Sequence, residues 1–244
     1  MAMESMEMSK VQQLYDACNI IFSSGKEGFP TLRHIRLLQD ILDDMNPMDV
    51  GIDGLSDARS LEEESSLRSP DGLILGQAVS QITYVHVHEC DDFSIGIFCF
   101  PAGATFPLHD HPHMVVLSKL LYGSALMKSY DWTTTPNSYP RKSGIAKMVA
   151  EDRVLEAPCK ASVLFSRSGG NIHSFTALTP CAILDVLAPP YSEEFDRPST
   201  YFAEIPIPSL SGYAVLEEID LPDDFRVAGA AYAGPELTVE SDYC

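Results

Sequence analysis

Two histidines separated by a single residue, His109 and His111, are the strongest chemical feature of this 244-residue sequence. They come shortly after Gly103 and after an apolar run over residues 93–100. Short apolar runs bounded by glycine and proline are typical of strands that end in tight turns. Because strand side chains two residues apart point to the same side, we expect the two imidazoles on one face, about 7 Å apart. Neutral imidazoles placed in this way can bind one metal ion together.

A third ligand is predicted much later in the chain. His173 follows the glycine pair Gly169-Gly170 and begins another apolar, strand-like run. A set of three histidines suits iron, zinc, nickel or copper. Since three protein ligands leave coordination positions open, such a site is typical of catalysis rather than of structural metal binding.

Other histidines fit the ligand pattern less well. His86 and His88 have the same spacing, but no glycine turn precedes them and a polar stretch over residues 89–92 follows. We expect these two side chains to be packed or hydrogen-bonded. His113 comes after Pro112, which interrupts a strand, so its expected place is the surface or a position that supports the ligands.

A carboxylate and a tyrosine are candidates for binding and catalysis. Asp185 lies inside the apolar run over residues 182–188. A lone carboxylate in such a strand costs free energy unless it is paired, so it faces either solvent or a pocket, where it can hold a substrate ammonium group. Tyr191 directly follows Pro189-Pro190, and we expect it at the pocket mouth with its hydroxyl available.

These residues need a scaffold of many short strands. Between residues 78 and 188 apolar runs alternate with turns and no helix intervenes, which indicates an all-β sandwich or barrel. Apolar residues at three- and four-residue spacing predict one helix over residues 9–23 and a second that opens at Pro30 and stops at Asn46-Pro47. We expect both helices to pack on the barrel or to cover one end of it.

The glycines and histidines together resemble the two-part signature of the cupin barrel, Gly-x5-His-x-His followed by Gly-x-x-His. We therefore expect a cupin-type double-stranded β-helix, or jelly-roll barrel, with two N-terminal α-helices. In most cupins a glutamate follows the histidine pair by four or five residues. Here Val115 and Val116 stand at those positions, which leaves a site of three histidines.

Composition divides the chain into four segments. We expect a helical segment over residues 1–50, a flexible acidic linker over 51–75, the barrel over 76–202, and a C-terminal segment over 203–244 that wraps the outside of the barrel. The linker is rich in glycine, serine and glutamate, which is typical of a mobile connection. Within the barrel, residues 146–149 and 153–157 read as two separate short strands.

The formal net charge of −19 lies mainly at the two ends of the chain, and the predicted barrel is nearly neutral. So acidic a balance argues against binding nucleic acid and favours cationic partners. The six cysteines include no C-x-x-C pair, no apolar run reaches the ~20 residues that span a membrane, and no signal peptide is recognisable. We therefore expect no membrane association and a reducing, intracellular location.

Longer motifs resemble the plant cysteine oxidases, which are relatives of animal cysteamine dioxygenase. They cover most of residues 9–235 and include Pro107-Leu108-His109-Asp110-His111-Pro112, Lys128-Ser129-Tyr130-Asp131-Trp132, Ser168-Gly169-Gly170-Asn171-Ile172-His173 and Ala188-Pro189-Pro190-Tyr191-Ser192. The resemblance implies a non-haem iron(II) thiol dioxygenase that adds both atoms of O2 to the sulfur of an N-terminal cysteine. In plants this reaction marks group VII ethylene response factors for degradation through the N-degron pathway, so the enzyme would act as an oxygen sensor.

By position, the resemblance assigns His109, His111 and His173 to Fe(2+), with O2 as co-substrate. It gives Asp185 and Tyr191 catalytic roles in the pocket. The partner that it implies is a protein or peptide with an N-terminal cysteine, and the enzyme is expected to be a monomer.

Two positions depart from the family pattern. Ser199 stands where relatives often carry a cysteine, two residues before the tyrosine matched by Tyr201, so a Cys–Tyr crosslink cannot form there. His113 replaces a common small residue beside the ligand pair. Two other functions stay open: oxidation of free small thiols (cysteamine or cysteine), and a non-catalytic metal-binding cupin. No basic residue near the ligand motifs is available for the carboxylate of free cysteine.

Overall fold

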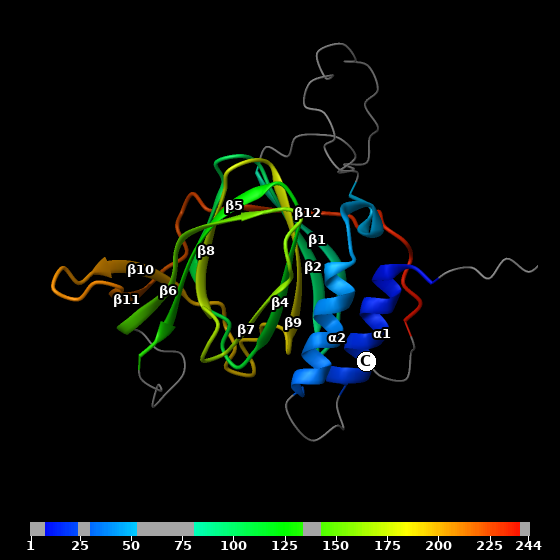
Figure 1. The fold of residues 1–244 in the computed structure, drawn as a ribbon, viewed down its shortest axis with the longest axis horizontal. Coiled ribbons are helices and arrows are strands. Elements are labelled where there is room, and N and C mark those ends of the chain that lie inside the picture. Colours follow the sequence, from blue (N-terminus) through cyan, green and yellow to red (C-terminus); the bar gives the residue numbers. More distant parts are fainter. Residues whose placement is uncertain (1–7, 24–29, 53–80, 134–142, 240–244) are drawn as a thin grey trace, which may run out of the picture.

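The strands of this protein form two six-stranded sheets that face one another. The computed structural model describes residues 8–23, 30–52, 81–133 and 143–239. The strands are β1 (Ile82–Glu89), β2 (Ser94–Phe100), β3 (Thr105–His109), β4 (Val115–Tyr122), β5 (Ser124–Trp132), β6 (Ser143–Glu156), β7 (Ser162–Phe165), β8 (Ile172–Ala177), β9 (Cys181–Ala188), β10 (Tyr201–Pro206), β11 (Tyr213–Ile219) and β12 (Val227–Ala230). One sheet has the order β12-β1-β2-β9-β4-β7, and the other closes on itself in the order β10-β11-β6-β5-β8-β3 (Figure 1). The predicted all-β, cupin-type double-stranded β-helix is therefore confirmed.

Two helices precede the barrel, α1 (Lys10–Phe22) and α2 (Leu32–Asp43), and a short 3₁₀ helix, η1 (Pro47–Val50), follows them. The hydroxyl of Ser9 caps α1 by accepting a hydrogen bond from the backbone N–H of Gln12. Pro30 does not open α2, contrary to the expectation. Thr31 is the N-cap residue instead, because its hydroxyl accepts from the N–H of His34 and satisfies a donor that the first helical turn leaves unpaired.

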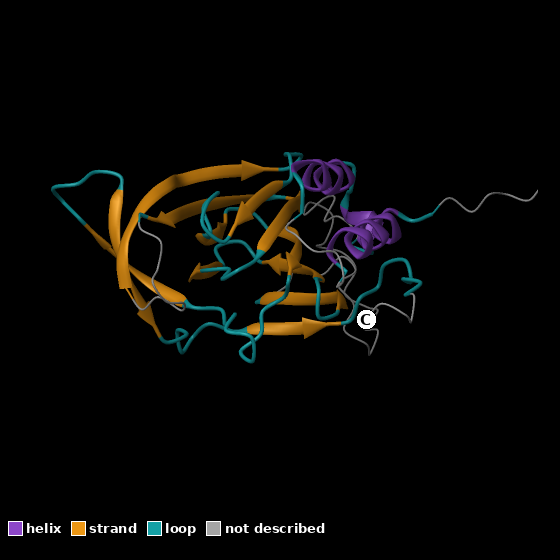
Figure 2. Ribbon diagram, turned by 90° about the horizontal axis from the view of Figure 1, so that it is seen from below, coloured by secondary structure: helices purple, strands orange, loops and turns teal. Residues whose placement is uncertain are grey.

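The helices cover the outer face of the first sheet, as Figure 2 shows from below. Side chains alternate along β2, so Ile95 and Ile97 are fully buried in the same apolar cluster as the inward faces of α1 and α2. Ser94 and Phe98 point the other way and line an internal pocket. One face of this sheet therefore stabilises the fold, and the other is left for a site.

The same alternation explains the carboxylate inside an apolar strand. On β9, Leu184 and Val186 pack toward the helices, whereas Asp185 between them lines the pocket. Residues 182–188 are apolar apart from Asp185 because both faces of this sheet are covered.

The C-terminal segment does more than wrap the barrel. β10 pairs with β11, and β11 pairs with β6, so both strands belong to the closed sheet. β12 runs parallel to β1 at the edge of the other sheet. The expected barrel boundary at residue 202 is therefore too early. An edge strand carries unpaired N–H and C=O groups. Residues 213–219 supply hydrogen-bond partners for β6, and residues 227–230 supply them for β1.

β6 is one strand of 14 residues where two short strands were predicted. Its pairing with β5 shifts register around Ser129, and Asp152 has a left-handed φ of 45°. The polar residues Glu151 and Asp152 thus mark an irregularity within a strand rather than a break between two strands.

Some expectations fall outside the described residues, among them the start of the barrel near Ala78 and most of the predicted linker. In the part of the chain that the structure describes, no helix is long and apolar enough to cross a membrane. Five of the six cysteines lie in that part, and they form no disulfide with one another.

Candidate metal centre

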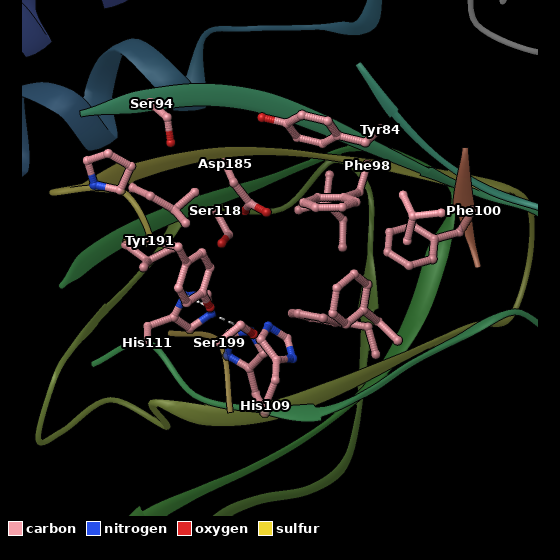
Figure 3. A pocket seen from close by; sticks show the side chains of 18 of the residues that line it. Tyr84, Ser94, Phe98, Phe100, His109, His111, Ser118, Asp185, Tyr191 and Ser199 are labelled. Atoms are coloured by element: carbon pink, nitrogen blue, oxygen red, sulfur yellow. Dashed lines mark hydrogen bonds between the residues drawn. The ribbon is translucent and has the colours of Figure 1, made fainter. Parts of the chain in front are cut away.

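Three histidines converge on one wall of the barrel interior (Figure 3). His109 ends β3 and pairs directly with His173 on β8, so residues far apart in the sequence are neighbours across the sheet. Nε2 of His111 lies 3.3 Å from Nε2 of His173. One ligand nitrogen from each of the three rings lies within 4.8 Å of the others, and all three side chains are buried. The structure thus brings the whole predicted ligand set together.

His111 lies beyond the end of β3, contrary to the expectation that it shares a strand with His109. Asn171 holds it in place. The amide oxygen of Asn171 accepts from the backbone N–H of His111 at 2.7 Å, and the amide NH2 donates to the His111 carbonyl at 3.2 Å. Asp131 accepts in turn from the N–H groups of Gly170 and Asn171, both at 3.0 Å. The second motif therefore supplies one ligand and positions another.

Hydrogen bonds at Nδ1 leave Nε2 of two rings free for a metal. Nδ1 of His109 lies 2.9 Å from the carbonyl oxygen of Pro107 and must donate to it. The Tyr191 hydroxyl lies 2.7 Å from Nδ1 of His111 and 2.7 Å from the carbonyl oxygen of Asp110. Since that carbonyl can only accept, Tyr191 donates to it and Nδ1–H of His111 donates to Tyr191. The hydroxyl is thus engaged rather than available, which corrects the expectation for Tyr191.

Burial keeps the three rings neutral. It lowers the pKa of His109 to about 4. Burial also lowers the pKa of His111 and of His173 well below the usual value, and repulsion from the neighbouring imidazoles adds to the effect. A neutral imidazole offers a lone pair to a metal, whereas a protonated one does not. Three neutral and convergent nitrogen donors fit a divalent transition metal and leave coordination positions open.

A pocket of about 410 Å³ separates the histidines from the sheet that the helices cover. Figure 3 shows Asp185 and Ser118 on that opposite wall. The two residues pair directly across β9 and β4. Burial raises the pKa of Asp185 to about 6, and hydrogen bonding with Ser118 partly opposes the increase. Asp185 therefore borders the pocket rather than facing solvent.

The pocket lining is rich in aromatic side chains and contains no lysine or arginine among the described residues. Its charged members are the carboxylates of Glu89 and Asp185. The aromatic side chains are Tyr84, Phe98, Phe100, Phe106, Phe175, Tyr191, Tyr201 and Phe225. Such a lining excludes water, strengthens electrostatic interactions and favours a cationic ligand over an anionic one.

The remaining candidate residues lie elsewhere or are chemically inert. The ring of His88 lies 4.8 Å from that of Tyr15 and 5.2 Å from that of Phe93, at the interface between helix and sheet. His86 and His113 are exposed. Ser199 lines the pocket beside the histidines, and its hydroxyl cannot form a thioether with a tyrosine.

Sequence reasoning did not assign the residues that hold the site in shape. Asn171 and Asp131 stand inside the recognised motifs, but their roles depend on contacts with residues about 40 to 60 positions away. Ser118 becomes a partner of Asp185 only through the register of β4 and β9. Ser118 lies in a largely apolar strand, and its polar side chain there was the available signal.

Comparison with known proteins identifies the family. The family model PCO_ADO matches residues 41–237. The chain is 41% identical to plant cysteine oxidase 1 from Arabidopsis thaliana, over 94% of this chain and 81% of that protein. It is 28% identical to 2-aminoethanethiol dioxygenase from Mus musculus, over 88% of this chain and 90% of that protein. Among solved structures, an RmlC-like cupin protein from Desulfovibrio desulfuricans aligns with a TM-score of 0.33 and 23% identity, over 51% of this chain and 99% of that chain.

Proposed function

This chain belongs to the PCO_ADO family and is a thiol dioxygenase, and from that premise we propose that it oxidises the N-terminal cysteine of a target protein to cysteine sulfinic acid. The reaction adds both atoms of O2 to one sulfur. By their names, the plant relative oxidises cysteine and the mouse relative oxidises 2-aminoethanethiol. Both of those compounds join a thiol to an amine two carbons away.

The charge of the pocket carries this proposal. Asp185 stands on the wall opposite the three histidines, where it can pair with a substrate ammonium group. Free cysteine would also bring a carboxylate, and the part of the lining that the structure describes offers no lysine or arginine to pair with it. An unpaired charge in an apolar pocket costs several kcal/mol, on the order of 3–5. In a peptide the same carboxyl group is an amide, so that cost is absent.

Iron(II) is the metal that we propose for the three histidines, whose neutral nitrogen donors and open positions suit it. When bound, iron supplies the redox chemistry that joins O2 to a coordinated sulfur. The chain's own residues do the remaining work. Pro107 and Tyr191 orient two of the ligand rings through Nδ1, and Asp185 holds the ammonium group. The aromatic lining keeps bulk water out of the pocket.

We further propose a role in oxygen sensing. Sulfinic acid at the N-terminus would mark the target for the N-degron pathway, so that the lifetime of the target follows the supply of O2. The support is the similarity to plant cysteine oxidase 1 across nearly the whole chain. In this proposal the targets resemble group VII ethylene response factors, and the enzyme works as a monomer in the cytoplasm and nucleus.

The direct test is mass analysis of a peptide with an N-terminal cysteine after incubation with the iron-loaded protein in air. We expect a gain of two oxygen atoms, and no gain when the amine is acetylated. An unmodified free-amine peptide would overturn the proposal. Oxygen consumption as the concentration of O2 is lowered then tests the sensing role, which requires the rate to depend on O2 throughout the cellular range.

Cysteamine is the second candidate substrate. It carries the ammonium group that suits Asp185 and lacks the carboxylate for which the lining has no partner. Competition between equal concentrations of peptide and cysteamine separates the two. If cysteamine is consumed and the peptide is not, the enzyme acts on small thiols.

A further inference from the structure

Tyr84 occupies the space that a side chain at Gly96 would need. A Cβ atom added to Gly96 would lie 2.4 Å from both Cε2 and the hydroxyl oxygen of Tyr84. The backbone of Gly96 is not in the left-handed region that favours glycine. The glycine is therefore explained by the tyrosine: without a side chain at this position, the phenol ring can lie over the Gly96 backbone.

This placement brings the Tyr84 hydroxyl to the side of the sheet where Asp185 stands. Gly96 on β2 and Asp185 on β9 are direct partners in the register. The Cβ positions of such partners lie on the same face, about 5 Å apart. A hydroxyl above the missing Cβ of Gly96 is therefore a neighbour of the Asp185 carboxylate. Figure 3 shows both side chains on the same wall of the pocket.

Asp185 has a carboxylate oxygen to offer. Its Oδ1 atom is buried and has no hydrogen-bond partner among the described residues. Ser118, its register partner on β4, interacts with the carboxylate from the other side. A buried and unsatisfied carboxylate oxygen costs free energy, and a ligand that donates a hydrogen bond removes that cost.

Tyr84 remains a neutral phenol in this setting. Burial raises its pKa to about 12, and the negative charges of Glu89 and Asp185 contribute to the increase. A neutral phenol has one proton and two lone pairs. It can donate to a carboxylate and at the same time accept from an N–H group.

We propose that Tyr84 is a positioning residue for the amine of the substrate, with its hydroxyl and Oδ1 of Asp185 accepting two N–H groups of one ammonium. The proposal rests on the proposed function, since it concerns the N-terminal amine of a cysteine peptide. Gly96 serves the site indirectly by seating the tyrosine. In this proposal, selection for a free N-terminus depends on Tyr84 of β1 and Gly96 of β2 in addition to Asp185.

The test is a binding measurement with a peptide in which serine replaces the N-terminal cysteine, so that no oxidation occurs. Fluorescence anisotropy of the labelled peptide on the metal-loaded protein gives Kd. We expect Tyr84→Phe to raise Kd roughly 10-fold for the free-amine peptide, the effect of one hydrogen bond to a charged group. Kd for the N-acetylated peptide should stay within twofold. Equal effects on both peptides, or none on either, would overturn the proposal.

Tyr122→Phe is the matched control. Tyr122 is also a half-buried strand tyrosine, but it does not line the pocket. This variant should bind both peptides as the unaltered protein does. A 10-fold loss in Tyr122→Phe as well would show that removal of a phenol hydroxyl acts through the fold, and the proposal would fail.

The role of Gly96 is tested by a double-mutant cycle. Gly96→Ala should weaken binding of the free-amine peptide about 10-fold when Tyr84 is present, because the ring is displaced. In a Tyr84→Ala background the same change should be nearly neutral, since the methyl group then fills vacated space. Equal losses of peptide affinity with and without the Tyr84 side chain would show that Gly96 does not act by making room for the tyrosine. If Gly96→Ala does not fold, the Tyr84→Phe comparison still decides.

Failure of this inference and failure of the proposed function give different results. If the unaltered protein does not oxidise a peptide with an N-terminal cysteine, the proposed function falls. If it does, and Tyr84→Phe keeps the same KM for that peptide, only the role of Tyr84 is wrong.

Discussion

The hydroxyl of Tyr191 lies 2.7 Å from Nδ1 of His111. The same hydroxyl donates to the carbonyl oxygen of Asp110 at 2.7 Å. Tyr191 therefore links the orientation of one ligand ring to the backbone between the two ligands of the His-x-His pair. Groups that hydrogen-bond a ligand imidazole in this way fix its tautomer and raise its basicity. A tyrosine expected at the pocket mouth thus supports the metal centre.

Replacing Tyr191 by phenylalanine tests that role. We expect the affinity for a divalent metal to fall about 10-fold, because the His111 ring loses its partner at Nδ1. Competition with a chromophoric chelator measures the change. Tyr213→Phe is the control, since Tyr213 lies on β11 outside the pocket lining. Unchanged metal affinity in Tyr191→Phe would contradict the supporting role.

Asp185→Asn tests the amine-binding role. The amide keeps the shape of the carboxylate but loses its charge, so kcat/KM for a peptide with an N-terminal cysteine should fall about 10- to 100-fold. Metal affinity should be unchanged, because Asp185 is not among the three ligands. Turnover equal to that of the unaltered protein would show that the ammonium group binds elsewhere.

The pH dependence of KM follows from the same carboxylate. The pKa of Asp185 is raised to about 6 by burial, so the group is ionised above pH 6 and neutral below it. KM for the peptide should rise as the pH falls from 7 to 5, up to about tenfold per unit below the pKa. In Asp185→Asn this rise should be absent. Initial rates at fixed O2 across that range measure both profiles, and parallel profiles would exclude Asp185 as the source.

The raised pKa of Asp185 also predicts that the site costs stability. The folded state holds the proton more tightly than the unfolded chain, where the pKa is near 3.8. The contribution of Asp185 to stability, measured as the difference between the unaltered protein and Asp185→Asn, should therefore decrease as the pH rises from about 4 to 6 and then level off. At pH 7.5, Asp185→Asn should increase the free energy of unfolding by about 1–2 kcal/mol. Urea denaturation measures the difference, and a loss of stability at that pH would contradict the argument.

The three histidine ligands were predictable because the pattern that identifies them lies in short stretches of sequence. Each histidine follows glycines and stands beside an apolar run, so residue type and spacing are sufficient to nominate His109, His111 and His173. The all-β class was predictable for a similar reason, since short apolar runs bounded by turns leave no room for interior helices. Local patterns do not show which strands become neighbours.

Contacts that depend on strand order therefore escaped prediction. β2 lies beside β9 although the strands are far apart in the chain, and only this arrangement makes Gly96 the partner of Asp185. Asn171 reaches the backbone of His111 for the same reason. The prediction for Pro30 was wrong because proline is favoured at the first helical position, whereas the hydroxyl of Thr31 caps the helix and α2 begins two residues after Pro30, at Leu32.

A buried cation between α2 and the barrel carries the last prediction. Nζ of Lys119 donates to the carbonyl oxygen of Cys159 at 2.7 Å and to that of Asp43 at 3.2 Å, and it lies 3.8 Å from the Asp43 carboxylate. Lys119 is 5% exposed. Lys119→Met should lower the free energy of unfolding by about 2–4 kcal/mol, because it leaves two carbonyls without their donor. The Asp43 carboxylate keeps the N–H of Ala161 and the amine of Lys160 as partners.

Lys128→Met is the matched control for Lys119→Met. Lys128 pairs with Glu204 at 2.7 Å on the partly exposed side of the barrel, where an ion pair is worth about 1 kcal/mol or less. Urea denaturation should thus show a large loss of unfolding free energy in Lys119→Met and a small one in Lys128→Met. Metal affinity should be unchanged in Lys119→Met, because this side chain does not line the pocket. Equal losses of stability in the two variants would show that the buried amine does not join α2 to the barrel.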